Sequence, residues 1–100
     1  MYQEGFYSGL TEEEVEQRVK SEGFTPIKFN DPPSYTYFEH THAETKVLAF
    51  LEGEMIVKVG DETFKCKAGD KLVIAPNTPH SAVVGSNGCT FFWSEKLLEV

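Results

Sequence analysis

The feature that most constrains the fold is a series of short strand-like runs that begins at Phe24 and continues almost to the end of the chain. The runs are rich in Val, Ile, Phe, Tyr and Thr, which favour β-strands. Clusters of Gly, Pro, Asn and Asp separate the runs and predict turns between them. The predicted strands are 24–29, 35–42, 46–52, 54–59, 62–67, 71–75, 80–84 and 89–94. Many short strands at this spacing predict an all-β sandwich or barrel.

Three of the predicted turns bear directly on the topology. Gly60-Asp61 joins two strand-like runs through only two residues, which is a signal for a tight β-hairpin. Glu52-Gly53 predicts a break between the strands 46–52 and 54–59. The stretch 85–88, Gly-Ser-Asn-Gly, predicts a loop between the strands 80–84 and 89–94.

One helix is predicted before the strands, over residues 11–22. Thr11 is suited to cap this helix, and Glu14 three residues later completes a capping box. Gly23 predicts the C-terminal end of the helix. The apolar stripe is thin, with only Val15 and Val19, so the helix is expected to lie on the surface of a larger unit.

The length of 100 residues predicts one domain over 1–100, with a helix at about 11–22 and a barrel at about 24–95. The 9 basic and 16 acidic residues give a formal charge of −7, which argues against binding to nucleic acid or anionic lipid. No apolar run approaches the roughly 20 residues of a membrane span, and no signal peptide is visible, so we expect a cytoplasmic protein. Cys66 and Cys89 are expected to be buried, reduced thiols.

The chemistry of the chain is concentrated in its three histidines, His40, His42 and His80. His40 and His42 are two residues apart in a strand-like run, so both side chains are expected on one face of the strand. Imidazole is a ligand that suits several transition metals, although two histidines on a strand face are more often ordinary surface or core residues. The same alternation places Thr36 and Phe38 on the histidine face, and Tyr37, Glu39 and Thr41 on the other.

Two segments around these histidines resemble the signature motifs of the cupin superfamily. Residues 40–53, HTHAETKVLAFLEG, resemble the first motif, His-x-His, three or four residues, Glu, six residues, Gly. Residues 69–80, GDKLVIAPNTPH, resemble the second motif, Gly, five residues, Pro-x-Gly, two residues, His. The resemblance implies a small jelly-roll barrel of two facing antiparallel sheets. It also implies that His40, His42 and His80 converge on one divalent transition metal, such as Zn, Fe, Mn or Ni.

Lys46 stands at the position where the family motif has a Glu ligand, and an ammonium group cannot ligate a metal. Three interpretations remain open. In the first, three histidines suffice, and Lys46 points inward as a catalytic residue that holds an anionic substrate or stabilises developing negative charge. In the second, Glu44 is a fourth ligand and Lys46 points outward. In the third, no metal binds, and the histidines and Lys46 line a pocket for an anion or small molecule.

Alternation along the same segment predicts an apolar row that needs cover. If Lys46 points into the barrel, Leu48 and Phe50 do so too. The intervening residues of 47–51 are all apolar and then face outward. A homodimer would cover this row, and so would the N-terminal helix or residues 24–29 of the same chain.

The predicted function lies between two classes. The cupin resemblance implies a metal-dependent dioxygenase or isomerase of a small anionic substrate. The alternative is a non-catalytic module that binds or senses a small molecule or a metal. The sequence has no Ser-His-Asp pattern, P-loop or dinucleotide fingerprint. The predicted partners are a small-molecule ligand or substrate and a second copy of the chain, with no nucleic acid and no membrane.

Overall fold

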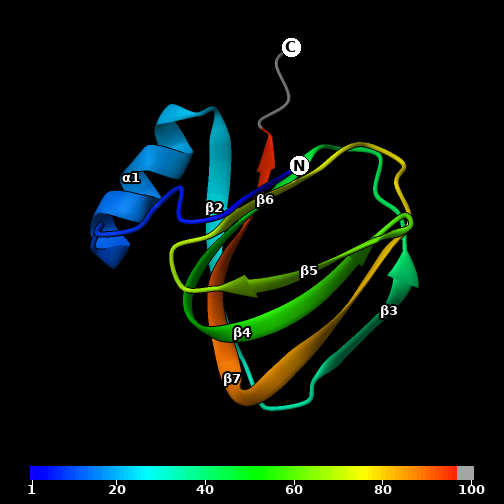
Figure 1. Ribbon diagram of the computed structural model, residues 1–100. Helices are drawn as coiled ribbons and strands as arrows, with labels where there is room; N and C mark the ends of the chain where they lie inside the picture. Colours follow the sequence, from blue (N-terminus) through cyan, green and yellow to red (C-terminus); the bar gives the residue numbers. More distant parts are fainter. Residues whose placement is uncertain (97–100) are drawn as a thin grey trace.

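The computed structural model describes residues 1–96, and its architecture is almost entirely β (Figure 1). One short helix precedes the main strands, as the sequence predicts. The elements are β1 (Tyr2–Gln3), α1 (Glu12–Ser21), β2 (Phe24–Asp31), β3 (Thr36–His40), β4 (Lys46–Val59), β5 (Glu62–Lys67), β6 (Lys71–Ile74) and β7 (His80–Lys96). Among the residues described, no helix is long and apolar enough to cross a membrane.

The two longest strands, β4 and β7, pair with each other and organise the barrel. The first part of β4 pairs with β6, and the last part of β7 pairs with β2, so the strand order there is β1-β6-β4-β7-β2. The second part of β4 pairs with β5, and the first part of β7 pairs with β3. All these pairs are antiparallel. The result is the two facing sheets of a jelly-roll barrel, which confirms the predicted fold class (Figure 1).

The predicted breaks at Glu52-Gly53 and at 85–88 are wrong, because β4 and β7 are continuous through both places. The register between the two strands shifts near Gly53, where both strands turn from one sheet into the other. Gly53 has φ +75° and Gly88 has φ +77°, a left-handed conformation that glycine adopts readily. These glycines therefore mark bends within long strands, not ends of short ones. The Gly60-Asp61 hairpin is confirmed, since Val59 pairs with Glu62 across it.

Two apolar clusters lie on opposite faces of the first part of β4. Leu48 and Phe50 belong to the barrel interior, as the predicted alternation requires. Ala49 faces the other way and packs with Val15 and Val19 of α1, the two residues of the predicted stripe. Leu51 packs against this second cluster. The outward row is therefore covered at these positions by the chain's own helix, and the homodimer stays a prediction.

The local signals for the helix and the cysteines are confirmed. The Thr11 side chain accepts from the N–H of Glu14, whose carboxylate accepts from the N–H of Thr11, so the capping box is complete. Gly23 follows the helix with φ +92°. Cys66 and Cys89 are free and buried. Burial raises the pKa of each thiol to about 12, so both stay protonated and unreactive at neutral pH.

A buried carboxylate, Asp70, fastens the N-terminal arm to the barrel, and the sequence analysis missed it. Its side chain is 1% exposed. It accepts hydrogen bonds from the Tyr2 hydroxyl at 2.6 Å, the Gly5 N–H at 2.9 Å and the Lys67 N–H at 3.0 Å. Burial alone would raise the pKa of Asp70, but these hydrogen bonds and the Lys67 ammonium outweigh it and hold the pKa below the usual 3.8.

Replacement of Asp70 by alanine is expected to lower the free energy of unfolding by about 3 kcal/mol at neutral pH, because three partly buried donors lose their acceptor. The folded-state pKa of Asp70 lies below its unfolded value, so its contribution is complete above that value and disappears as the pH falls through the folded-state pKa. Urea unfolding of both proteins at pH 7 and pH 3 should show a smaller gap at pH 3. A gap that does not change with pH would contradict this role.

Candidate metal centre

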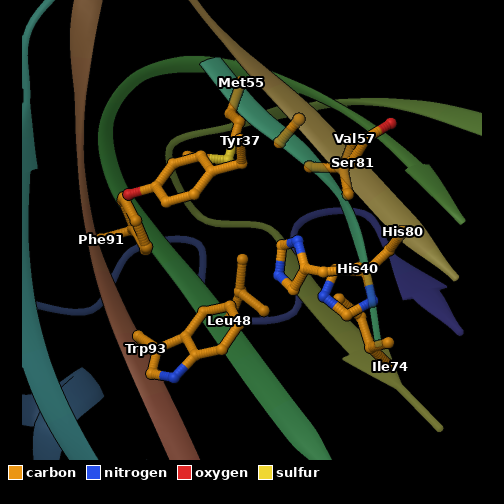
Figure 2. A pocket seen from close by; sticks show the side chains of 11 residues that line it. Tyr37, His40, Leu48, Met55, Val57, Ile74, His80, Ser81, Phe91 and Trp93 are labelled. Carbon is orange, nitrogen blue, oxygen red and sulfur yellow. The ribbon is translucent and has the colours of Figure 1, made fainter. Parts of the chain in front are cut away.

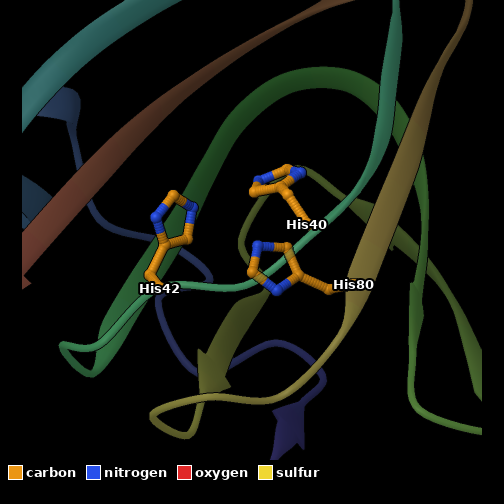
Figure 3. Close-up of side chains that lie close together, drawn as sticks. All are labelled: His40, His42 and His80. Carbon is orange, nitrogen blue, oxygen red and sulfur yellow. The ribbon is translucent and has the colours of Figure 1, made fainter.

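The three histidines meet at one end of the barrel, although they come from distant parts of the sequence (Figure 3). His40 ends β3, His42 lies in the loop that follows, and His80 begins β7 directly opposite His40. The ring centroids are 4.4 Å apart for His40 and His80, 4.8 Å for His40 and His42, and 5.2 Å for His42 and His80. One nitrogen from each ring lies within 4.8 Å of the others.

The predicted face of the histidine strand is wrong, because an irregularity in β3 breaks the alternation. The register against β7 shifts between Tyr37 and His40. As a result Tyr37 and His40 line the same cavity, whereas Phe38 is 83% exposed. An extra residue in a strand turns the following side chains to the other face. His42 lies beyond the end of β3, so loop geometry and not strand alternation brings it to His40.

Backbone carbonyls orient two of the imidazole rings. Nδ1 of His80 lies 2.9 Å from the carbonyl oxygen of Thr78, and Nδ1 of His40 lies 2.5 Å from that of Phe38. A carbonyl can only accept, so the proton is on Nδ1 and the Nε2 lone pair is free to bind a metal.

Among the three histidines, the Nε2 atoms of His42 and His80 are buried without a hydrogen-bond partner in the described part of the chain. Two nitrogens bound to one ion at 2.0–2.1 Å lie no more than about 4.2 Å apart, so small side-chain rotations would bring the three rings onto one ion. Buried polar atoms are normally satisfied, so the three rings fit a metal better than they fit an ordinary core.

The surroundings of His42 and His80 also favour the neutral form of these two rings. Burial lowers the pKa of His42, and the Lys46 ammonium and the other two histidines lower it further, against a smaller opposing effect of Glu44. Burial lowers the pKa of His80 as well, and His40 and Lys46 add to this, while the bond to Thr78 opposes it. Neutral imidazole is the form that ligates a metal.

Lys46 is buried beside the histidines, but its charge is balanced by two carboxylates. The side chain is 1% exposed, and Nζ lies 2.5 Å from Glu95 and 3.2 Å from Glu44. The ammonium is also 5.5 Å from the centre of the Trp93 ring. The interpretation in which Lys46 points outward while Glu44 ligates a metal is therefore wrong: Lys46 is buried, and Glu44 pairs with it. A catalytic role for Lys46 stays a prediction.

The ion-pair network of Lys46, Glu44 and Glu95 predicts how the stabilities of two variants compare. Replacing Lys46 with Met is expected to destabilise the fold less than replacing both Glu44 and Glu95 with Gln. In the first variant the two partly exposed carboxylates regain water, whereas the second leaves a buried ammonium without a counter-charge. Urea unfolding compares the two, with the exposed pair Glu39→Gln/Glu62→Gln as a control for net charge. The reverse ranking would mean that the ammonium reaches water.

Two neighbouring spaces adjoin the histidines. The inner one, inside the barrel, has a volume of about 30 Å³, enough for about one water molecule, and is mostly apolar (Figure 2). The outer one is a groove of about 320 Å³. Both are lined by Tyr37, His40, Phe91 and Trp93, so His40 stands where the two spaces meet.

The groove also contains functional candidates that the sequence patterns did not single out. Its lining residues are Phe29, Asp31, Tyr35, Tyr37, His40, His42, Phe91 and Trp93. Trp93 and Tyr37 border both the groove and the inner cavity. No local sequence pattern predicts that these residues line one groove, because β2, β3 and β7 come together only in the folded barrel.

Comparison with known protein families now places the chain. A family model described as the AraC-like ligand binding domain matches residues 27–95. The chain belongs to the AraC-like ligand-binding family. Cupin structures share the fold of this AraC-like domain. An RmlC-like cupin from Shewanella frigidimarina superimposes with a TM-score of 0.66 at 23% identity, over 77% of this chain and 69% of that one. Protein NMB1881 from Neisseria meningitidis gives a TM-score of 0.62 at 28% identity, over 75% of each chain.

One curated enzyme is similar to part of this chain. Acireductone dioxygenase 1 of Pectobacterium atrosepticum is 44% identical over 46 residues, which cover 42% of this chain and 27% of the enzyme. The matched part of the chain thus spans about a quarter of the length of this relative. The comparisons and the geometry together describe a small cupin with a three-histidine group suited to a metal.

Proposed function

We propose that this chain is a metal-dependent cupin in which His40, His42 and His80 hold a divalent transition metal at the end of the aromatic groove. The observation that carries the proposal is the pair of buried Nε2 atoms, on His42 and His80, that have no hydrogen-bond partner among the described residues. The nitrogen atoms of all three rings already lie within 4.8 Å of one another. Zinc, iron, manganese and nickel are the candidate metals, since imidazole is a common ligand for such ions.

The residues of the site prepare it in three ways. The carbonyl groups of Phe38 and Thr78 fix the ring orientation of His40 and His80. Burial and the nearby Lys46 keep the rings of His42 and His80 neutral. Three protein ligands leave coordination positions open, and the groove beside His40 and His42 gives a small molecule access to them. When bound, the metal supplies Lewis-acid chemistry and, if redox-active, oxygen chemistry.

The reaction class we propose is that of a dioxygenase or isomerase. The partial similarity to acireductone dioxygenase 1 supports oxygen chemistry, although it covers only 46 residues. The apolar lining of the inner cavity also supports oxygen chemistry. Leu48, Met55 and Phe91 keep bulk water away from the buried Nε2 atom of His80.

A non-catalytic ligand-binding module is the second candidate, and one observation favours it. Apart from the histidines, the ionisable residues that line the two spaces are Asp31, Tyr35 and Tyr37. The Tyr37 hydroxyl donates to Asp31 at 2.5 Å, and burial followed by this bond raises the pKa of Tyr37. Tyr37 is therefore not free to move a proton near the histidines, and a binding module does not need it to. The AraC-like ligand-binding description of the family agrees with this candidate.

Elemental analysis of untagged protein, purified without chelator, tests the proposal beside a His40→Ala/His42→Ala variant. We expect about one metal per chain in the parent and none in the variant. No metal in either protein, even after addition of Zn²⁺, Fe²⁺, Mn²⁺ or Ni²⁺, would overturn the metal centre. Oxygen uptake by the iron-loaded protein with candidate substrates then separates a dioxygenase from a binding module.

A further inference from the structure

The groove beside the histidines carries a second polar group, the carboxylate of Asp31. Asp31 ends β2, whereas His40 and His42 belong to β3 and the following loop, yet all three line the same groove of about 320 Å³. The Tyr37 hydroxyl donates to one oxygen of this carboxylate, Oδ2, at 2.5 Å. This bond fixes the orientation of the carboxylate and leaves Oδ1 for another donor. Asp31 is only half-buried, so a ligand in the groove can reach it.

Aromatic rings form most of the remaining groove. Phe29 stacks on Phe91, with ring centroids 5.7 Å apart, and Tyr35 meets Tyr37 edge to face at 5.0 Å. Phe29 and Tyr35 remain 39% and 47% exposed, although Phe29 lies over a core residue. Trp93 completes the lining. Apolar rings left open to solvent beside a polar site are typical of a surface that a ligand covers.

The charges in and around the groove favour a cation over an anion. Within the described part of the chain, no lysine or arginine lines the groove. Lys46, whose ammonium lies 5.5 Å from the centre of the Trp93 ring, is already paired with Glu44 and Glu95. Ring faces attract cations through their quadrupoles, and a carboxylate adds a full negative charge. The chain as a whole carries a formal charge of −7, which attracts cations as well.

We infer that the groove binds an organic cation, an ammonium group with an apolar substituent, whose charge lies against Asp31 and the surrounding rings. The substituent lies between Phe29 and Trp93, and the rest of the molecule extends toward His40 and His42. The inference rests on the proposed function for the role of the histidines, and it names the class of substrate or ligand that reaches them. It departs from the small anionic substrate that the sequence analysis expects.

The fluorescence of Trp93 provides a direct test, because Trp93 is the single tryptophan of the chain and lines the groove. Metal-free protein is titrated with three probes that share a phenyl ring: benzyltrimethylammonium, benzyl alcohol and phenylacetate. We expect saturable binding of the cation, at least roughly fivefold tighter than that of the neutral alcohol, and the weakest binding for the anion. Added salt should weaken only the binding of the cation. Equal affinities for the three probes, or no response to the cation, would overturn the inference.

Matched variants locate the charge that is responsible. Asp31→Asn keeps the shape of the side chain and is expected to reduce the preference for the cation by roughly fivefold or more. Asp61→Asn, in the exposed hairpin turn, changes the net charge equally and is expected to leave the preference unchanged. An equal effect of both substitutions would mean that net charge and not the groove selects the cation, which would contradict the inference.

The outcomes also separate this inference from the proposed function. Cation binding is measured on the metal-free parent protein, and metal binding is measured separately by elemental analysis. If the protein binds no metal but prefers the cation, the metal centre fails and the groove stands. If the protein binds metal but shows no preference for the cation, the metal centre stands and this inference fails.

Discussion

Replacement of His80 by alanine is expected to weaken metal binding by at least about 100-fold. His80 is the most buried of the three histidines, and the Thr78 carbonyl already orients its ring. Changes to residues that only orient a metal ligand typically weaken affinity by about 10- to 100-fold, so loss of the ligand itself should have at least the larger effect. Competition with a chromophoric chelator, on untagged protein, measures the dissociation constants of parent and variant.

Thermal unfolding checks that the His80→Ala effect is local. A bound metal stabilises the folded state by mass action, so a chelator should lower the Tm of the parent protein. The chelator should leave the Tm of the variant unchanged. The metal-free forms should unfold within a few degrees of each other if the cavity left by the ring is tolerated. A variant that keeps the parent's metal affinity would show that the metal binds elsewhere.

Substitution of Gly53 by alanine is expected to lower the free energy of unfolding by about 3–5 kcal/mol, and more if β4 and β7 cannot separate. Gly53 has φ +75°, a conformation that strains any residue with a Cβ. A Cβ atom at this position would also overlap the carbonyl group of Gly88 in the paired strand β7. Urea unfolding followed by circular dichroism measures the loss.

Gly60→Ala is the matched control for Gly53→Ala. Gly60 also has a positive φ, of +59°, but nothing lies within 4 Å of the position of its missing Cβ. Its substitution should therefore show only the backbone strain, about 1–2 kcal/mol. If both variants lost the same amount, the close approach of β4 and β7 would have no energetic weight, and the bend would depend on backbone conformation alone.

Much of the fold follows from local signals that need no tertiary information. The capping box at Thr11 and the glycine at position 23 bound α1, and the thin stripe of Val15 and Val19 is the face it buries. Gly60-Asp61 forms the predicted hairpin. The motifs around the three histidines predict that these residues lie together, and the structure does bring them together from β3, the following loop and β7.

Other features depend on pairings that the sequence does not display. Glu52-Gly53 is a typical turn sequence. The strand β4 nevertheless continues through it, because β7 pairs with β4 on both sides of Gly53. The shift in β3 places Tyr37 beside His40, against strict alternation, and only the register with β7 reveals it. Asp70 reads as a turn residue, and its contacts with Tyr2 and Gly5 come from the opposite end of the chain.

The shared strands β4 and β7 limit how this barrel can move. Each strand runs through both sheets, and the two stay paired from Lys46–Glu95 at one end to Val59–His80 at the other. The two sheets therefore have no hinge between them and cannot separate to admit a ligand. Any gating of the groove must come from its rim, where the loop that carries His42 is tied to the Asn77 N–H by one backbone hydrogen bond of 2.6 Å. We therefore expect the motion of that loop to set the rates of ligand entry and release, while the barrel itself stays rigid.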